Sequence, residues 1–141
     1  MVSIIMCTYN RAHLVAESIY SVLSQTYVDW ELIIMDDGST DNTEAIVRNI
    51  PDPRIKYHSL AHTGCTGRMK NRAMHQAAGK YIAFHDSDDL WATDKLEKQV
   101  QLLNDHAAAG FCITDVVTFR GKTILSPHSY RVVQGIQCTN L

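Results

Sequence analysis

Residues 2–10, VSIIMCTYN, decide the fold class, because an apolar run ends abruptly there in Thr8-Tyr9-Asn10. A short apolar run bounded by turn-forming residues is typical of a buried parallel strand. The next apolar residues recur at the spacing of one helix face, at Val15, Ile19, Val22 and Leu23. We therefore expect a strand followed by a helix, with Asn10 as the N-cap of that helix.

The same alternation continues along the chain. Further strands are expected at 32–35, 55–60, 81–85 and 111–119, the last returning through Arg120-Gly121-Lys122 to a short strand at 123–125. One intervening helix is capped by Asp41, with Glu44 in capping-box spacing, and ends before Pro51. A third helix ends at Gly79, and a fourth covers 96–103. This order predicts one α/β domain over 1–141, with a Rossmann-like, mostly parallel sheet and helices on both faces.

The composition excludes several classes of protein. The 141 residues are 45% hydrophobic and 20% charged, which is typical of one globular domain. A formal charge of −2 leaves no broad basic surface for nucleic acid or anionic membranes. No run reaches the ~18 apolar residues of a membrane span, and no signal peptide is apparent. We expect a soluble, cytoplasmic protein whose full-length form can lie at the inner face of the membrane.

The cysteines and two of the histidines are not expected to form a site. The cysteines, Cys7, Cys65, Cys112 and Cys138, are widely spread without zinc spacing. Cys7 and Cys112 are interpreted as buried small apolar residues. His62 and His85 are interpreted as structural or incidental.

Polar residues gather directly after the expected strands. The clusters are Thr8-Tyr9-Asn10, Asp36-Asp37-Gly38-Ser39, residues 62–68 and Asp86-Ser87-Asp88-Asp89. In an open α/β sheet, ligands bind outside the carboxyl ends of the strands. The four clusters are therefore expected along one edge of the sheet, as one binding site.

The last acidic cluster suggests a divalent cation. Asp86 and Asp88 are two residues apart at a strand end, so in extended geometry their side chains project to the same side. Two close carboxylates repel each other unless a cation lies between them. Oxygen ligands suit Mn²⁺ or Mg²⁺, which proteins commonly share with substrate phosphates. The basic residues of the third helix, Arg68, Lys70 and Arg72, are candidates for contacts with those phosphates.

Each of these residues also has a plainer interpretation. The aspartate clusters can be turns or helix caps, and the basic residues can form the solvated face of a helix. Tyr9 can be a surface aromatic. The placement of these residues together, rather than any single motif, favours a binding site.

Several blocks of the sequence, in order, resemble the family 2 glycosyltransferases of the GT-A fold. They are residues 2–5 leading into Thr8-Tyr9-Asn10-Arg11, residues 21–27, residues 36–41, and residues 79–84 running into Asp86-Ser87-Asp88-Asp89. The resemblance extends from residue 2 to about residue 103. It implies a nucleotide-sugar-binding portion of an inverting, metal-dependent glycosyltransferase of polysaccharide or glycoconjugate synthesis.

The resemblance also implies roles for individual residues. Tyr9 packs on the nucleotide base, with Thr8 near the base and ribose. Asp37, with Asp36 beside it, accepts a hydrogen bond from the base, which favours UDP because uracil offers an N–H donor. Asp86 lies near the ribose and the metal, and Asp88 is the principal metal ligand. The remaining residues of the predicted nucleotide-sugar site are Arg11, Arg68, Lys70, Asn71 and Ser87.

Two departures from the family pattern stand out. Lys70 precedes Asn71 where Arg is commoner, and lysine lacks the bidentate fork of arginine. The family's general base, which deprotonates the acceptor hydroxyl, lies well past the Asp86-x-Asp88 motif. We therefore expect it beyond Leu141, and we do not assign it to Asp115, which falls inside the predicted fifth strand. The chain is then the N-terminal donor-binding portion, with little or no transfer activity of its own.

Other functions remain open from the sequence. One is a non-catalytic nucleotide-binding or scaffolding module. A phosphate-receiver domain or an aspartate phosphatase is disfavoured, because its acidic residues would follow the first strand, where Thr8-Tyr9-Asn10 stands. The expected partners are a UDP-sugar donor, a saccharide or lipid-linked acceptor, and a second copy of the chain at an open sheet edge.

Overall fold

The computed structural model describes residues 1–121 and 123–126, and the predictions for Lys122 and Cys138 lie outside this range. The chain divides into two compact units, Met1–Leu96 and Glu97–Leu141. Among the described residues, no helix has the length and apolar character that a membrane crossing requires.

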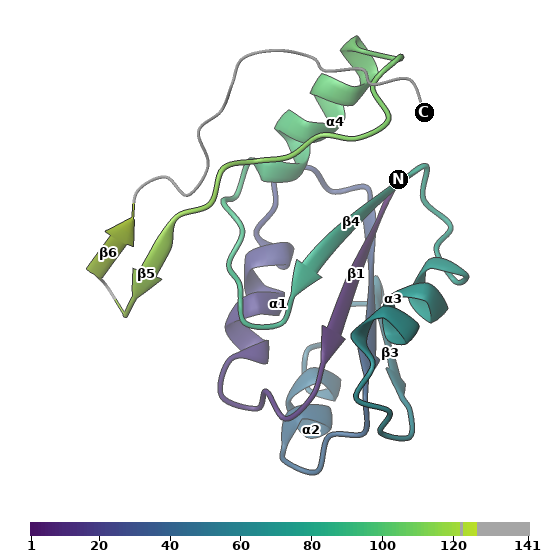
Figure 1. The fold of residues 1–141 in the computed structure, drawn as a ribbon, viewed down its shortest axis with the longest axis vertical. Helices are drawn as coiled ribbons and strands as arrows, with labels where there is room; N and C mark the ends of the chain where they lie inside the picture. The colour runs from purple at the N-terminus through teal and green to yellow at the C-terminus, as the bar shows by residue number, and fades with distance from the viewer. Residues whose placement is uncertain (122, 127–141) are drawn as a thin grey trace. The chain divides into compact units, whose positions relative to one another are not determined.

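The first unit is built on a four-stranded parallel sheet (Figure 1). Its strands are β1 (Val2–Thr8), β2 (Trp30–Asp36), β3 (Ile55–Ser59) and β4 (Tyr81–Asp86), in the spatial order β3-β2-β1-β4. Ile4 pairs with Leu32 on one side and with Ala83 on the other, so β1 lies between β2 and β4. The predicted strands and their parallel arrangement are confirmed, and all four carboxyl ends lie at one edge.

Helices cover both faces of this sheet, as predicted. They are α1 (Val15–Leu23), α2 (Thr43–Arg48) and α3 (Thr66–Met74). Met69 and Ala73 of α3 pack on Ile5, Ile33 and Met35. On the opposite face, Ser18 of α1 contacts His85 of β4, and Val15, Ile19 and Val22 of α1 are fully buried. Figure 1 shows α1 and α3 on opposite sides of β1 and β4.

Two predicted helix signals have other roles. Asn10 does not cap α1, whose N-cap is Leu14 without a side-chain hydrogen bond. Asn10 instead takes a positive φ of 51° and binds the loop after β2. The N-cap of α2 is Asn42 rather than Asp41, although Asp41 Oδ1 accepts the backbone N–H of Thr43 at 3.0 Å.

Gly79 does not end α3, which stops at Met74 with His75 as its C-cap. The backbone N–H of Gly79 donates to Ser3 Oγ at 2.8 Å, and the neighbouring Ala78 N–H donates to the Glu31 carboxylate at 2.8 Å. A Cβ at position 79 would lie 2.6 Å from the backbone nitrogen of Ser3. The glycine is therefore required for close packing of this segment on β1.

The second unit differs most from the sequence prediction. The fourth helix is confirmed as α4 (Lys95–Asp105), which begins at the end of the first unit, and a hairpin joins β5 (Thr118–Arg120) to β6 (Thr123–Ser126). The strand expected at 111–119 is wrong except for its last two residues. Phe111 is 78% exposed and Ile113 is 77% exposed, so this apolar run has neither the burial nor the ladder of a sheet strand.

Cys7 and Cys112, which were expected to be buried small apolar residues, are only partly buried. Cys65, for which no burial was predicted, is exposed.

Candidate nucleotide-binding site

A cavity of about 360 Å³ lies at the carboxyl edge of the sheet, within the first unit. It brings together residues from the ends of β1, β2 and β4 and from the β3–α3 segment. Its lining residues are Cys7, Thr8, Tyr9, Arg11, Asp37, His62, Gly64, Thr66, Met69, Asp86, Ser87 and Asp88. The predicted convergence of the four loops at one edge is confirmed by this geometry.

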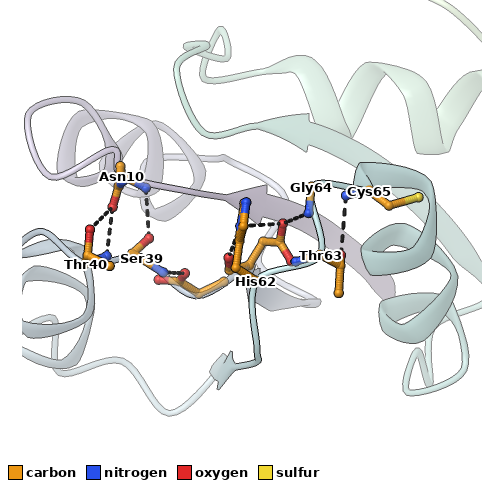
Figure 2. Close-up of polar contacts among 9 residues, drawn as sticks. Asn10, Ser39, Thr40, His62, Thr63, Gly64 and Cys65 are labelled. Atoms are coloured by element: carbon orange, nitrogen blue, oxygen red, sulfur yellow. Dashed lines mark hydrogen bonds and ion pairs between the residues drawn. The ribbon is translucent and has the colours of Figure 1, made fainter.

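The loop that carries Tyr9 and Arg11 is fixed by hydrogen bonds to the loop after β2. The N–H of Asn10 donates to Ser39 Oγ at 2.8 Å, and its side-chain oxygen accepts the N–H of Thr40 at 2.8 Å (Figure 2). The N–H of Arg11 donates to Thr43 Oγ1 at 3.0 Å. These bonds hold Tyr9, which is 40% exposed, at the cavity wall.

Asp37 anchors the loop between β3 and α3. Its Oδ1 accepts the N–H and the hydroxyl of Thr63, and its Oδ2 accepts the N–H of Gly64 at 2.8 Å (Figure 2). Burial by itself would raise the pKa of the Asp37 carboxyl, but the hydrogen bonds from Thr63 and Gly64 outweigh burial and lower it. Asp37 is therefore a buried, ionised group in the wall of the cavity.

Asp36 does not line the cavity, although it is adjacent to Asp37. Its side chain is fully buried, where Oδ2 accepts the hydroxyl of Tyr57 at 2.5 Å and Oδ1 accepts the N–H of Ser39 at 2.7 Å. These bonds connect β2 to β3 and to the loop after β2. The carboxylate of Asp36 thus supports the site from behind rather than facing it.

His62 lines the cavity, which its interpretation as an incidental residue did not anticipate. Its ring stacks on Tyr9, with ring centroids 4.3 Å apart and an interplanar angle of 24°. Its Nδ1 lies 2.8 Å from the carbonyl oxygen of Asp37 and 3.1 Å from Asp37 Oδ2. His62 therefore joins the aromatic wall of the cavity to its buried carboxylate.

The acidic rim of the cavity comes from the end of β4. The carboxylates of Asp86 and Asp88 are 60% and 46% exposed, and Ser87 between them is buried. Asp86 lies 3.5 Å from Lys70 Nζ, and Asp88 lies 3.6 Å from Arg11 Nε. Burial, and then the charges of Asp86 and Asp88, raise the pKa of the neighbouring Asp89 carboxyl.

The rim fits a divalent cation only as a partial site. Among the described residues, no group of three or more His, Cys, Asp or Glu side chains could hold a metal ion. Mg²⁺ and Mn²⁺ are often bound through one or two carboxylates and completed by substrate phosphates and water. Asp86 and Asp88 suit that arrangement, because their carboxylates are exposed and have only loose ion pairs.

The remaining predicted residues differ in placement. Lys70 reaches the rim through Asp86, whereas Arg68 and Asn71 are exposed on α3 and do not line the cavity. Cys7 and Met69 line it without having been predicted. Burial raises the pKa of the Cys7 thiol to about 11, so it is protonated at neutral pH and is not a nucleophile.

The fold is that of a mostly parallel α/β domain of the GT-A type, with a cavity at the carboxyl edge of its sheet. The glycosyl transferase family 2 model matches residues 3–136. Over 103 residues the chain is 45% identical to the Escherichia coli UDP-Glc:alpha-D-GlcNAc-diphosphoundecaprenol beta-1,3-glucosyltransferase WfgD, covering 73% of this chain and 41% of that protein. It is 39% identical over 111 residues to the putative teichuronic acid biosynthesis glycosyltransferase TuaG of Bacillus subtilis, covering 77% of this chain and 44% of that protein.

Solved structures agree with this relationship. S. aureus TarS 1–349 in complex with UDP superposes with a TM-score of 0.72 at 30% identity, covering 75% of this chain and 32% of that one. The mannosyltransferase PcManGT of Pyrobaculum calidifontis, in complex with GDP-Man and Mn²⁺, gives a TM-score of 0.68 at 30% identity, covering 72% and 32%. The chain belongs to glycosyl transferase family 2. It spans about two-fifths of the length of WfgD and of TuaG.

Proposed function

We propose that this chain binds the donor of a glycosyl transfer reaction, a nucleotide-diphosphate sugar and most simply a UDP-sugar. One observation carries the proposal: a single cavity joins an aromatic ring, a buried carboxylate and a pair of exposed carboxylates at the carboxyl edge of the sheet. The UDP-Glc donor in the name of WfgD and the UDP in the TarS complex support uridine as the nucleoside.

The proposed roles follow from where each side chain lies. Tyr9 offers a ring face to the base, and Asp37 offers acceptor oxygens to a base N–H. Thr8 and Ser87 also line the cavity, where we propose contacts with the nucleotide-sugar. Arg11 and Lys70 lie beside the rim, where their charges suit a diphosphate.

Asp88 and Asp86 would hold a Mn²⁺ or Mg²⁺ ion together with the diphosphate. Such an ion neutralises the negative charge that develops on a departing diphosphate. We propose transfer to a hydroxyl of a saccharide or lipid-linked acceptor with inversion at the sugar, in polysaccharide or glycoconjugate synthesis. The chain supplies the donor-binding portion, and we assign no general base among its described residues.

Calorimetric titration with UDP tests the proposal. We expect the purified chain to bind UDP in the presence of Mn²⁺ and to bind it much more weakly in EDTA. The D88A variant is expected to weaken the Mn²⁺-dependent binding by at least about tenfold, because a ligand of the ion is lost. The matched control is D105A, which removes an exposed carboxylate at the end of α4.

Two results would contradict the proposal. One is the absence of binding of UDP, GDP and dTDP to the folded chain at millimolar concentration. The other is equal UDP affinity with Mn²⁺ and with EDTA, which would remove the metal from the proposed site. If D88A and D105A weakened UDP binding equally, the loss of affinity would come from the change in net charge and not from the loss of a metal ligand at the rim.

A further inference from the structure

We propose that the imidazole of His62 competes with the nucleobase for its binding position. This side chain must leave Tyr9 and Asp37 before a base can bind. This inference rests on the proposed function of the cavity as a nucleotide site. Residues 62–68 were expected at this edge of the sheet, but His62 itself was interpreted as structural or incidental. The geometry of the imidazole carries the inference.

The protonation of the ring follows from its neighbours. Nδ1 of His62 faces two acceptors, the carbonyl oxygen of Asp37 at 2.8 Å and Asp37 Oδ2 at 3.1 Å. A carbonyl oxygen can only accept, so Nδ1 carries the hydrogen and donates. The imidazole thus presents a flat face to Tyr9 and a ring N–H to Asp37.

A pyrimidine or purine base with a ring N–H offers the same two features. In the proposed site it would place its flat face on Tyr9 and donate its N–H to the Asp37 carboxylate. One side chain, His62, makes both contacts in this structure. The base and the imidazole therefore compete for the same ring and the same oxygen.

The oxygens of Asp37 leave little room for a further donor. Oδ1 already accepts the N–H and the hydroxyl of Thr63, at 2.8 and 3.0 Å. Oδ2 accepts the N–H of Gly64 at 2.8 Å and faces His62 Nδ1. A carboxylate has about four lone-pair positions, and His62 Nδ1, 3.1 Å from Oδ2, lies at the one that a base could take without breaking the loop.

The backbone keeps His62 close to this position. Gly38 has a positive φ of 76°, and a Cβ there would lie 2.8 Å from the backbone nitrogen of His62. The two loops therefore pack backbone against backbone at this point. The side chain of His62 is 50% exposed, so it can swing into solvent while the loop stays in place.

The competition has a measurable consequence. A ligand that binds only the open form has its apparent affinity reduced by the fraction of molecules that are open. Removing the imidazole makes every molecule open, so H62A is expected to bind UDP roughly fivefold more tightly, given the strength of a stacked pair and a hydrogen bond. The same factor applies to any nucleotide whose base stacks on Tyr9 in place of His62, whether or not it has a ring N–H, so the ratio of UDP to CDP affinity stays unchanged.

The experiment compares wild type, H62A and H75A by titration with UDP and CDP in the presence of Mn²⁺. His75 is an exposed histidine after α3 that does not line the cavity, so H75A is expected to match the wild type. Circular dichroism establishes that all three are folded. A uniform gain in H62A supports the competitor role.

Other outcomes overturn the inference. Weaker UDP binding by H62A, or a changed UDP to CDP ratio, would mean that His62 contacts the bound base instead of competing with it. Unchanged affinity would mean that the imidazole does not occupy the base position. In both cases wild-type binding of UDP leaves the proposed function standing. Failure of all three folded proteins to bind either nucleotide contradicts the proposed function and, with it, the competitor role.

Discussion

Asp36 and Asp37 are adjacent in the chain, yet their carboxylates have opposite surroundings. Asp36 is the last residue of β2, and the alternation of the strand turns its side chain to the same face as Leu32 and Ile34, where it is fully buried. Asp37 follows the strand and lines the cavity. The sequence predicted an acidic pair at this point, but only the strand boundary separates the supporting carboxylate from the one that lines the cavity.

The supporting role of Asp36 predicts the effect of Y57F. Burial, and then the Asp36 carboxylate, raise the pKa of Tyr57, whose hydroxyl donates to Asp36 Oδ2. Removing this donor leaves a buried carboxylate short of one hydrogen bond, so we expect the free energy of unfolding to fall by about 1–3 kcal/mol. The UDP affinity of Y57F is expected to stay within about twofold of the wild-type value, since Tyr57 does not line the cavity and the cavity keeps its shape.

Denaturant unfolding measures the stability change in Y57F, with Y20F as its control. Tyr20 is 58% exposed, so the same chemical change there is expected to have little effect. A loss of UDP affinity in Y57F without a loss of stability would mean that Asp36 faces the nucleotide after all.

His85 predicts the pH dependence of stability. Its side chain is buried between Ser18 and Trp91, and burial lowers its pKa from 6.5 to about 4. Between these pH values the unfolded chain carries a proton on this imidazole and the folded chain does not. Acid therefore favours unfolding in this window, and stability is expected to fall by up to about 3 kcal/mol from pH 7 to pH 4.

Unfolding curves followed by tryptophan fluorescence at pH 7, 6, 5 and 4 test this expectation. The variant H85Q cannot take up the proton, so its stability is expected to change less over the same range. The lowered pKa values of Asp37 and Asp41 act in the same direction, but mainly below about pH 4. An equally steep pH dependence in H85Q would assign the effect to other groups.

At the scale of the element, the joint between β1 and the segment before β4 depends on Gly79. We expect G79A to lower the free energy of unfolding by about 1–3 kcal/mol, because the new methyl group would meet the backbone of Ser3 and Met1. G67A is the matched control. A Cβ at position 67, in the first turn of α3, meets nothing within 4 Å, so this change is expected to be neutral or to stabilise by up to about 1 kcal/mol. Similar thermal midpoints for the two variants would contradict the packing argument.

Elements were predictable where their apolar pattern reflects burial on the sheet. Residues 2–7 and 32–35 are apolar on both faces because helices cover both sides of β1 and β2, and this pattern is visible in the sequence. Residues 111–117 also include several apolar residues, but they are mostly exposed and irregular in the structure. An apolar run indicates that a segment is suited to a buried strand. It does not show whether a neighbouring strand is present to complete the backbone hydrogen bonds.

At the scale of the whole molecule, the order of strands and helices fixed where the site would be, because parallel strands send all their carboxyl ends to one edge. Tyr9, Asp37, Asp86 and Asp88 were therefore predictable as neighbours from sequence alone. Residues 62–68 were also expected at this edge, but the contacts of His62 with Tyr9 and Asp37 were not predictable, since they depend on how the loop 61–65 folds around Asp37. Loop conformation of this kind depends on contacts between distant residues, such as Gly38 with His62, and these leave no local pattern.

The association of the chain with a second copy stays a prediction. In the described part of the four-stranded sheet, β4 is an end strand, and Ile82 and Phe84 on it are 43% and 50% exposed. End strands and exposed apolar residues are common at contacts between chains.

The hydrogen bonds of Asn10 have a practical consequence for redesign. This residue joins the turn that carries Tyr9 to the turn that begins α2, through Ser39, Thr40 and Asp41. Exchanging only one of the two turns with that of a relative would remove the hydrogen bonds between them. Tyr9 would then no longer be held in position. A designer who wishes to alter this wall of the cavity must therefore transplant both turns together.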